Sequence, residues 1–137
     1  MASRDLHNNV KVSPAIDPAA IKTGNGVTTS ATIDGQGFES LEFALQSGVI
    51  TDGSFTPAVY AGDAANMSDE ALVAAADLLG TIAGATFAAT DDSVTKKIGY
   101  RGTKRYARVK ITQSGATTGG YISAVAVQGH AHNAPVA

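Results

Sequence analysis

Seven of the ten lysine and arginine residues in this chain lie between residues 96 and 110, a segment without an acidic residue. Cations at this density could bind nucleic-acid phosphates, or they could form the solvated face of a pair of strands. Alternation places Val109 and Ile111 on one side of a strand, and Arg108 and Lys110 on the other. A nucleic-acid site would also need several exposed aromatic rings among the cations. We therefore predict an outward strand face and no direct binding to nucleic acid.

His130 and His132 form a second group that could do chemistry, because imidazoles separated by one residue lie on the same side of an extended chain. Such a pair could supply two ligands to a metal ion. The chain has no cysteine and one other histidine, His7, so a third ligand would have to be a distant carboxylate or come from another subunit. We expect instead a solvated or interface-packed tail, and we predict no metal and no cofactor.

Sequence patterns of common active sites are missing. There is no Gly-x-Ser-x-Gly elbow, and histidines occur only near the two ends of the chain, so a Ser/His/Asp triad would need an unusual fold-back. Asp91 and Asp92 are adjacent, which points two carboxylates apart on a strand and suits a turn. The glycine-rich segment 24–26 is followed by neither a helix nor Lys-Ser/Thr, as a phosphate loop would be. We predict that the protein is not an enzyme.

The charges are segregated along the chain. Ten of the 12 acidic residues lie between residues 23 and 95, where there is no lysine or arginine. If the two blocks lie on different surfaces, the molecule has an acidic side and a basic side, which suits contacts between subunits. If they lie on neighbouring strands, they neutralise each other across the sheet. The sequence leaves both interpretations open.

The composition predicts a single small domain. The chain has 137 residues, no cysteine, no tryptophan and 6% aromatic residues, so its core must consist mainly of small aliphatic side chains without disulfides. Thin β cores gain stability by association, and we expect a homo-oligomer, either a trimer or a dimer. We find no apolar run of about 18 residues and no signal peptide, so we expect synthesis in the cytoplasm and no membrane contact.

Short segments with β-branched residues and period-2 alternation, separated by glycine-rich turns, predict an all-β fold. We predict a single-domain antiparallel β-sandwich, jelly-roll-like, over residues 27–137 with a short C-terminal tail, preceded by an extended arm over residues 1–26. Pro57 predicts an edge position or a bulge in its strand. The expected strands cover residues 27–33, 38–46, 55–60, 85–88, 95–100, 105–112 and 121–128.

Two further segments carry specific predictions. In the arm, Val10 and Val12 flank Lys11 in an alternating pattern that could extend a sheet edge, either in this chain or in a neighbouring subunit. Residues 68–80 begin with Ser68, continue with acids and alanines, and end at Gly80. This order is typical of a helix with a capping serine and a terminating glycine, so we predict one or two helical turns there.

From about Gly35 onward, the sequence resembles a group of small structural proteins that tailed phages and prophages encode near their head genes. The matching segments are Gly37–Phe43, Ser47–Gly53, Ala76–Thr81, Ile98–Val109, Ala124–His130 and Ala134–Ala137. Residues 66–75 depart from the group, which has a shorter polar loop there. The resemblance implies a virion component made in the bacterial host cytoplasm and bound to the capsid surface as a decoration (cement) protein, with the major capsid protein as its partner.

For this role we expect the arm and one charged face to contact the capsid. Tyrosine and arginine carry a disproportionate share of binding energy at interfaces, which favours Tyr106 as an anchor; the alternative is a partly buried ring under a loop. The expected interface residues are Val10, Val12, Arg101, Lys104, Arg105, Tyr106, Arg108 and Lys110. Two other roles stay open: a host- or glycan-binding module on the virion, and a head–tail connector or tail component.

Overall fold

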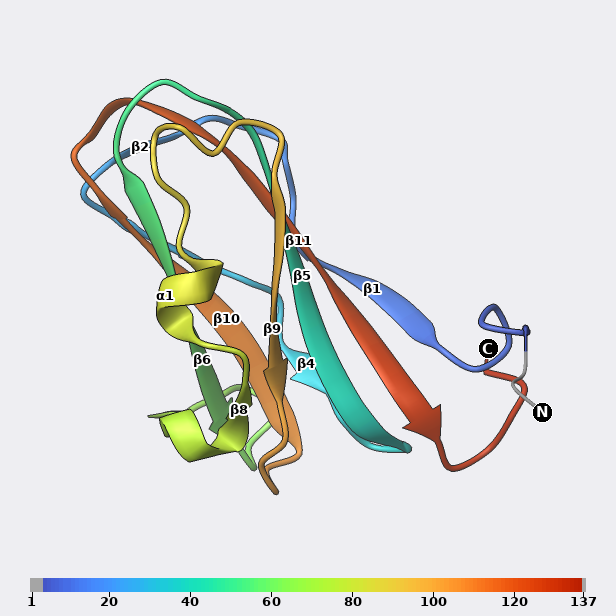
Figure 1. The fold of residues 1–137 in the computed structure, drawn as a ribbon. Helices are drawn as coiled ribbons and strands as arrows, with labels where there is room; N and C mark the ends of the chain where they lie inside the picture. Colours follow the sequence, from blue (N-terminus) through green and yellow to red (C-terminus); the bar gives the residue numbers. More distant parts are fainter. Residues whose placement is uncertain (1–3, 137) are drawn as a thin grey trace.

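The computed structural model describes residues 4–136, which form two antiparallel β-sheets packed face to face (Figure 1). Sheet A contains, in spatial order, β1 (Lys11–Ile16), β11 (Ala116–Ala131), β5 (Phe38–Ile50), β9 (Thr95–Tyr100) and β8 (Leu78–Leu79), with β2 (Lys22–Gly24) also paired to β11. Sheet B contains β3 (Val27–Thr29), β10 (Tyr106–Ser114), β6 (Ser54–Gly62) and β7 (Ala71–Leu72), with β4 (Ile33–Asp34) also paired to β10.

The strand order is that of a jelly roll. When β2 and β4, which pair beside the main strand order, and the edge strand β8 are set aside, eight strands remain, including the two-residue β7. Their chain order in sheet A is first, eighth, third and sixth. In sheet B the order is second, seventh, fourth and fifth. Two four-stranded sheets with this order define the double-sheet jelly roll. The predicted fold class, an antiparallel β-sandwich with one short helix, is confirmed. Within residues 1–26, the segment predicted as an extended arm, β1 and β2 are strands of sheet A paired with β11.

The core lies between the sheets and follows the alternation of the sequence. In β5, Leu41, Phe43 and Leu45 point inward and are buried, while Glu42 and Ala44 point outward. In β10, alternate residues from Ala107 to Gln113 are buried in the same way. Period-2 alternation places one set of side chains on the core face, so burial of these residues holds the strands in register. Phe55 and Phe87 fill the remaining centre of the sandwich.

Two prolines fall within strands, and both occupy positions where no backbone N–H is needed for a hydrogen bond to a neighbouring strand. Pro14 lies in β1, the edge strand of sheet A, next to an irregularity in the pairing with β11. Pro57 lies in β6, which pairs on one side with β10 along its length. On its other side β6 is bridged at Phe55 and pairs with β7 only at Tyr60 and Ala61. From the sequence, Pro57 is predicted to mark an edge position or a bulge; β6 lies between β10 and β7, but Pro57 itself lies where β6 has no partner on its outer side.

The helix predicted over residues 68–80 is wrong. The segment instead contains β7, a 3-10 turn at Ala75–Asp77 and β8, and the short helix α1 lies further along at Ile82–Ala85. Asp69 accepts backbone hydrogen bonds from Asp63 and Ala64, and the following residue forms ion pairs with β10. Alanine-rich helix propensity is weak over so short a segment, and these tertiary contacts override it.

Two predicted strands also differ in the structure. Residues 27–33 contribute to two short strands, β3 and β4. Between them the Ser30 amide still donates to the Val109 carbonyl at 2.9 Å, but the Ser30 hydroxyl accepts the 2.9 Å hydrogen bond from the Val109 amide. Residues 85–88 do not form a strand of their own. Ala85 ends α1, and Phe87 makes only an isolated bridge to Phe55.

The segment around Val12 lies on the edge of the chain's own sheet. In β1, Val12 pairs with Val127 of β11, so the predicted sheet-edge extension is confirmed, and Val10 directly precedes the strand. The N-terminal segment and the C-terminal tail lie together beyond one end of the sandwich (Figure 1), where the Val136 amide donates to the carbonyl of Asn8.

Candidate functional site

The outer side of sheet B carries most of the basic residues predicted as interface. Tyr106, Arg108 and Lys110 point outward from β10, because Ala107, Val109 and Ile111 point into the core. Arg108 lies opposite Tyr60 of β6 in the pairing register. We call the set Tyr60, Glu70, Tyr106, Arg108 and Lys110 the basic face.

Glu70 connects the cations of the basic face. The Arg108 Nε donates a 2.7 Å hydrogen bond to Glu70 Oε2, and the Lys110 ammonium donates to Oε1. The side chains of Arg108, Glu70 and Lys110 are only 22%, 19% and 22% exposed. The Lys110 Nζ also lies 4.4 Å from the centroid of the Tyr60 ring, at cation–π distance.

These contacts shift the protonation of the group. The hydrogen bond from Arg108, followed by that from Lys110, lowers the pKa of Glu70 from its ordinary 4.5 to about 2. The same hydrogen bond to Glu70 raises the pKa of Arg108. Glu70 and Arg108 therefore stay charged, and held by each other, over the whole physiological pH range.

Lys104 and Arg105 directly precede β10, and each forms an ion pair with an acidic residue in a more exposed position. Arg105 donates two 2.9 Å hydrogen bonds to the two carboxylate oxygens of Asp34, and its guanidinium lies 4.9 Å from the Tyr106 ring centroid. The hydrogen bond from Arg105 is the main cause that lowers the pKa of Asp34. Lys104 Nζ lies 2.7 Å from Asp63. Exposed pairs of this kind contribute little to stability, but they fix the side-chain positions.

The ion pairs decide between the two interpretations of the charge segregation. Acids from the first block pair with bases from the second, so the blocks neutralise each other across the fold. The pairs are Asp34–Arg105, Asp63–Lys104, Glu70–Arg108, Glu70–Lys110 and Asp91–Lys96.

The remaining predicted interface residues lie elsewhere. Arg101 donates 3.1 and 2.9 Å hydrogen bonds to the Ala76 carbonyl, which ties the end of β9 to the 3-10 turn. Val12 points outward from sheet A, on the opposite side of the sandwich from the basic face. The structure therefore brings together Lys104, Arg105, Tyr106, Arg108 and Lys110, but places Arg101, Val10 and Val12 apart from them.

Sequence reasoning missed a serine–histidine contact. Ser40 is aligned with Gly129 in the register of β5 and β11, so its hydroxyl contacts Nδ1 of His130, while His132 contacts Glu39. The sequence carries no signal of this contact, because 90 residues separate Ser40 from His130. Within residues 4–136, no carboxylate orients the other nitrogen of His130, as a hydrolytic triad would require, and no group of three metal-ligating side chains is present.

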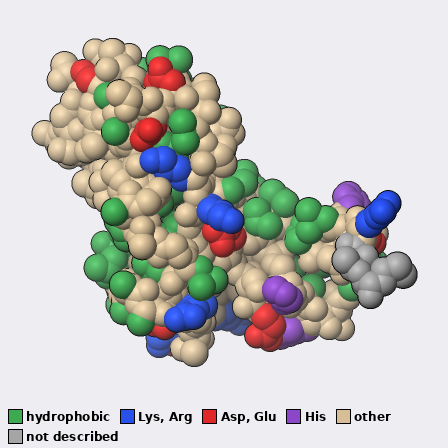
Figure 2. Space-filling model, in the orientation of Figure 1, with side chains coloured by type: hydrophobic (Ala, Val, Ile, Leu, Met, Phe, Trp, Pro, Cys, Tyr) green, Lys and Arg blue, Asp and Glu red, His purple; other side chains and the backbone are tan. Residues whose placement is uncertain are grey.

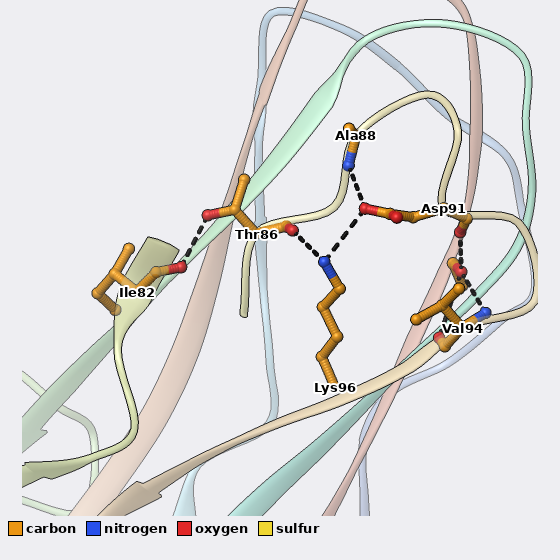
Figure 3. A network of polar contacts seen from close by, with 7 residues as sticks. Ile82, Thr86, Ala88, Asp91, Val94 and Lys96 are labelled. Atoms are coloured by element: carbon orange, nitrogen blue, oxygen red, sulfur yellow. Dashed lines mark hydrogen bonds and ion pairs between the residues drawn. The ribbon is translucent and has the colours of Figure 1, made fainter. Parts of the chain in front are cut away.

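A second polar network pins the loop before β9 (Figure 3). Lys96 Nζ donates 2.6 Å and 3.1 Å hydrogen bonds to the Thr86 carbonyl and Asp91 Oδ2, and the Ala88 amide donates to the same carboxylate at 2.8 Å. The bond from Ala88 is the main cause that lowers the pKa of Asp91. The network fixes residues 86–94 against the sandwich and has a structural role.

Comparison with known proteins identifies no family. No family model matches the chain, and no curated protein matches it. Among solved structures, it is similar to a chain from "Structure of infectious bursal disease virus Gx strain", with 15% identity and a TM-score of 0.43. The similarity covers 98% of this chain but 37% of that chain. At this score the likeness is no basis for a functional conclusion. No helix in the described part of the chain is long and apolar enough to cross a membrane.

The arrangement on sheet B suits contact with another protein. Four of the five residues of the basic face lie in β6 and β10, and its long side chains are already held by Glu70 and by the Tyr60 ring. Ordering a free arginine or lysine on binding costs about 0.5–1.5 kcal/mol, and much of that cost is absent here. Tyrosine and arginine in such a setting are typical of the residues that dominate protein interfaces.

Proposed function

We propose that this protein is a structural component of a phage virion, and that it binds the surface of the assembled capsid as a decoration protein with the major capsid protein as its partner. The resemblance of the sequence from about Gly35 onward supports the proposal. Jelly rolls occur in viral capsid domains, but also in lectins and cupins, so the fold is compatible with this role without selecting it. In this proposal the protein needs no cofactor and makes no contact with the packaged DNA.

The single observation that carries the proposal is the basic face. Tyr106 and Tyr60 lie beside cations that Glu70 has already neutralised in part, on the outer side of a rigid sheet. Such a face can bury its aromatic rings against a protein with one net positive charge in place of two, because Arg108 and Lys110 share the Glu70 carboxylate. A surface for DNA would instead need cations free to neutralise phosphates.

The segment before β1 provides a second contact in this proposal. Residues 4–10 lie beyond the end of sheet A beside the C-terminal tail (Figure 1). All of them except Val10 are exposed. A strand-free extension of this kind can reach a neighbouring subunit and hold two subunits together. Residues 11–16 are different, because they form β1 and their removal would take a strand out of sheet A.

The proposal is tested by binding the purified protein to heads that lack it, followed by sedimentation and quantification of the bound protein. Tyr106→Ala should weaken binding by about tenfold or more, as expected for a hot-spot tyrosine. Thr112→Ala changes an exposed side chain further along the same side of β10 and is the matched control. Equal occupancy by the Tyr106→Ala and Thr112→Ala variants would contradict the proposed role of the basic face.

The arm is tested separately by removing residues 1–9, which leaves β1 complete. We expect this shortened chain to keep the thermal stability of the full chain and to lose occupancy of the heads. Removing residues 1–20 would also abolish occupancy, but it deletes β1 and so confuses loss of folding with loss of binding. Full occupancy by the chain shortened by residues 1–9 would show that the arm is not part of the contact.

A further inference from the structure

The outer side of sheet A carries an apolar surface that no other segment of the described chain covers. Val12 is 60% exposed, Leu79 49% and Val125 39%. Figure 2 shows this side of the molecule, with hydrophobic side chains gathered over β1 and β11. We call it the apolar face and define it by two neighbouring rows of outward residues: Val12, Val127, Glu42, Gly99 and Leu79 in the first row, and Pro14, Val125, Ala44 and Lys97 in the second.

The apolar face contains one acid and one base, Glu42 and Lys97. Neither side chain has a hydrogen bond or an ion pair within residues 4–136. Burial raises the pKa of Glu42, and the nearby charge of Lys97 opposes this shift. The other bases between residues 96 and 110 behave differently. Arg101 donates to the Ala76 carbonyl, and the rest are in ion pairs: Lys96, Lys104, Arg105, Arg108 and Lys110. A partly buried carboxylate without a donor is a group that a partner can stabilise.

Gly99 determines where the Glu42 carboxylate lies. A Cβ atom on Gly99 would be 2.7 Å from Glu42 Oε2 and 3.0 Å from the Cβ of Leu79. The carboxylate therefore extends sideways from β5 and lies over β9, at the position of Gly99 in the first row. Lys97 also projects from β9, two residues away, in the second row. The acid and the base thus occupy equivalent places in the two rows.

We propose that the apolar face is the contact between two copies of this chain, related by a two-fold axis that runs across the strands between the two rows. Such an axis exchanges the rows, so Val127 packs against Val125 of the second copy and Val12 against its Pro14. It also places Lys97 of the second copy over Gly99, where it meets the Glu42 carboxylate. By symmetry this ion pair forms twice. Sheets stacked at about 10 Å leave room for these side chains between them.

The charges favour a second copy over a different protein as the occupant. A two-fold interface uses the same patch on both subunits, so the patch must be complementary to itself. Here the acid and the base lie at positions that one axis exchanges, and apolar residues continue both rows on the β1 side. A partner with charge of one sign at this point would repel either Glu42 or Lys97.

This contact is independent of the capsid-binding role. The apolar face lies on sheet A and the basic face on sheet B, so a dimer leaves both basic faces free. The two proposals can therefore fail separately, since one concerns the oligomeric state in solution and the other the occupancy of heads.

The test is sedimentation velocity of the full chain, without capsids, between about 1 and 100 µM. We expect a dimer. Glu42→Lys and Lys97→Glu should each raise the dimer dissociation constant by about tenfold or more, because each places like charges together twice. The double variant, which exchanges the two charges, should restore the dimer. A restored dimer would show that neither substitution prevents the chain from folding. Thr112→Lys, which adds a charge on sheet B, is the control and should leave the dimer unchanged.

Cross-linking tests the same contact at the level of residues. A carbodiimide joins a carboxylate to an amine without a spacer, and a mixture of isotope-labelled and unlabelled chains shows whether the two groups come from different copies. We expect Glu42–Lys97 cross-links that combine one labelled and one unlabelled peptide. Monomers at every concentration, a dimer that survives both single charge reversals, or cross-links only within one copy would each overturn the proposal.

Discussion

Glu70 accepts a 2.7 Å hydrogen bond from the Nε of Arg108, although the two residues are 38 positions apart in the chain. The bond joins the acidic block of the sequence to the basic block, and it produces a partly neutralised cluster of one acid and two bases on one sheet face. The basic face is for this reason a fixed surface and not a set of free cations. Its stability and its acid sensitivity can both be measured through this carboxylate.

Replacing Glu70 by glutamine should destabilise the protein. The change leaves Arg108 and Lys110, each 22% exposed, without their shared carboxylate, and we expect the free energy of unfolding to fall by about 1–3 kcal/mol. Urea unfolding followed by circular dichroism measures the difference. Asp63→Asn is the matched control, because its partner Lys104 is 52% exposed, and it should change stability much less than Glu70→Gln does. Equal effects of the two variants would contradict the importance of the Glu70 cluster.

The same carboxylate predicts how stability depends on pH. In the folded chain the pKa of Glu70 is about 2, against an ordinary value of 4.5, so the unfolded chain takes up the proton first as the pH falls. The stabilisation from Glu70 is therefore complete above pH 4.5 and is lost as the pH falls towards about 2. Asp34, Asp69 and Asp91, whose pKa values are also lowered, act in the same direction. Glu70→Gln should show a shallower loss over this range, and a profile parallel to that of the unchanged protein would disagree with the assignment.

Gly119 should not tolerate a side chain. It has a φ of +85°, and a Cβ atom there would lie 1.9 Å from the carbonyl oxygen of Lys22 in β2. We expect Gly119→Ala to lower the free energy of unfolding by more than about 2 kcal/mol, from backbone strain and displacement of β2. Gly115 has a φ of +66° but open space around it, so Gly115→Ala isolates the strain and should cost about 1 kcal/mol. Thermal unfolding of both variants separates the two contributions, and similar losses would argue against close packing of β2.

Lys96→Met should loosen the loop over residues 86–94 without affecting the basic face. The variant loses the hydrogen bonds to the Thr86 carbonyl and to Asp91, and we expect a loss of about 1–3 kcal/mol. Amide hydrogen exchange should accelerate in residues 86–94, while occupancy of heads stays unchanged. Lys11→Met removes an exposed lysine without such bonds and should leave exchange in this loop as it was. Unchanged exchange in the Lys96→Met variant would mean that packing, and not this network, holds the loop.

The main strands could be predicted because alternation is a local property. The patterns around Phe43 and Val109 identify β5 and β10 without knowledge of their neighbours, and the segment 95–100 coincides with β9. The helix prediction failed over residues 68–80 because its first turn contains Asp69 and Glu70. Their carboxylates are bound by Asp63, Ala64, Arg108 and Lys110, and no local pattern reveals these partners.

The candidate site could be predicted in part. The outward side of β10 follows from alternation, so Tyr106, Arg108 and Lys110 were placed on one face correctly. Their neutralisation by Glu70 was one of two open interpretations, because it depends on which strands the fold makes adjacent. The contact between Ser40 and His130 and the lateral position of Glu42 over Gly99 both arise from register across β5, and register is not encoded in any single segment.

The most direct test of capsid decoration is the number of copies of this protein per virion, measured by quantitative mass spectrometry of purified particles against the major capsid protein. Binding to the repeating capsid lattice predicts on the order of hundreds of copies per particle, in a fixed ratio to the major capsid protein. About six or twelve copies, the number set by a head–tail connector or tail, would contradict capsid decoration, as would absence of the protein from the particle.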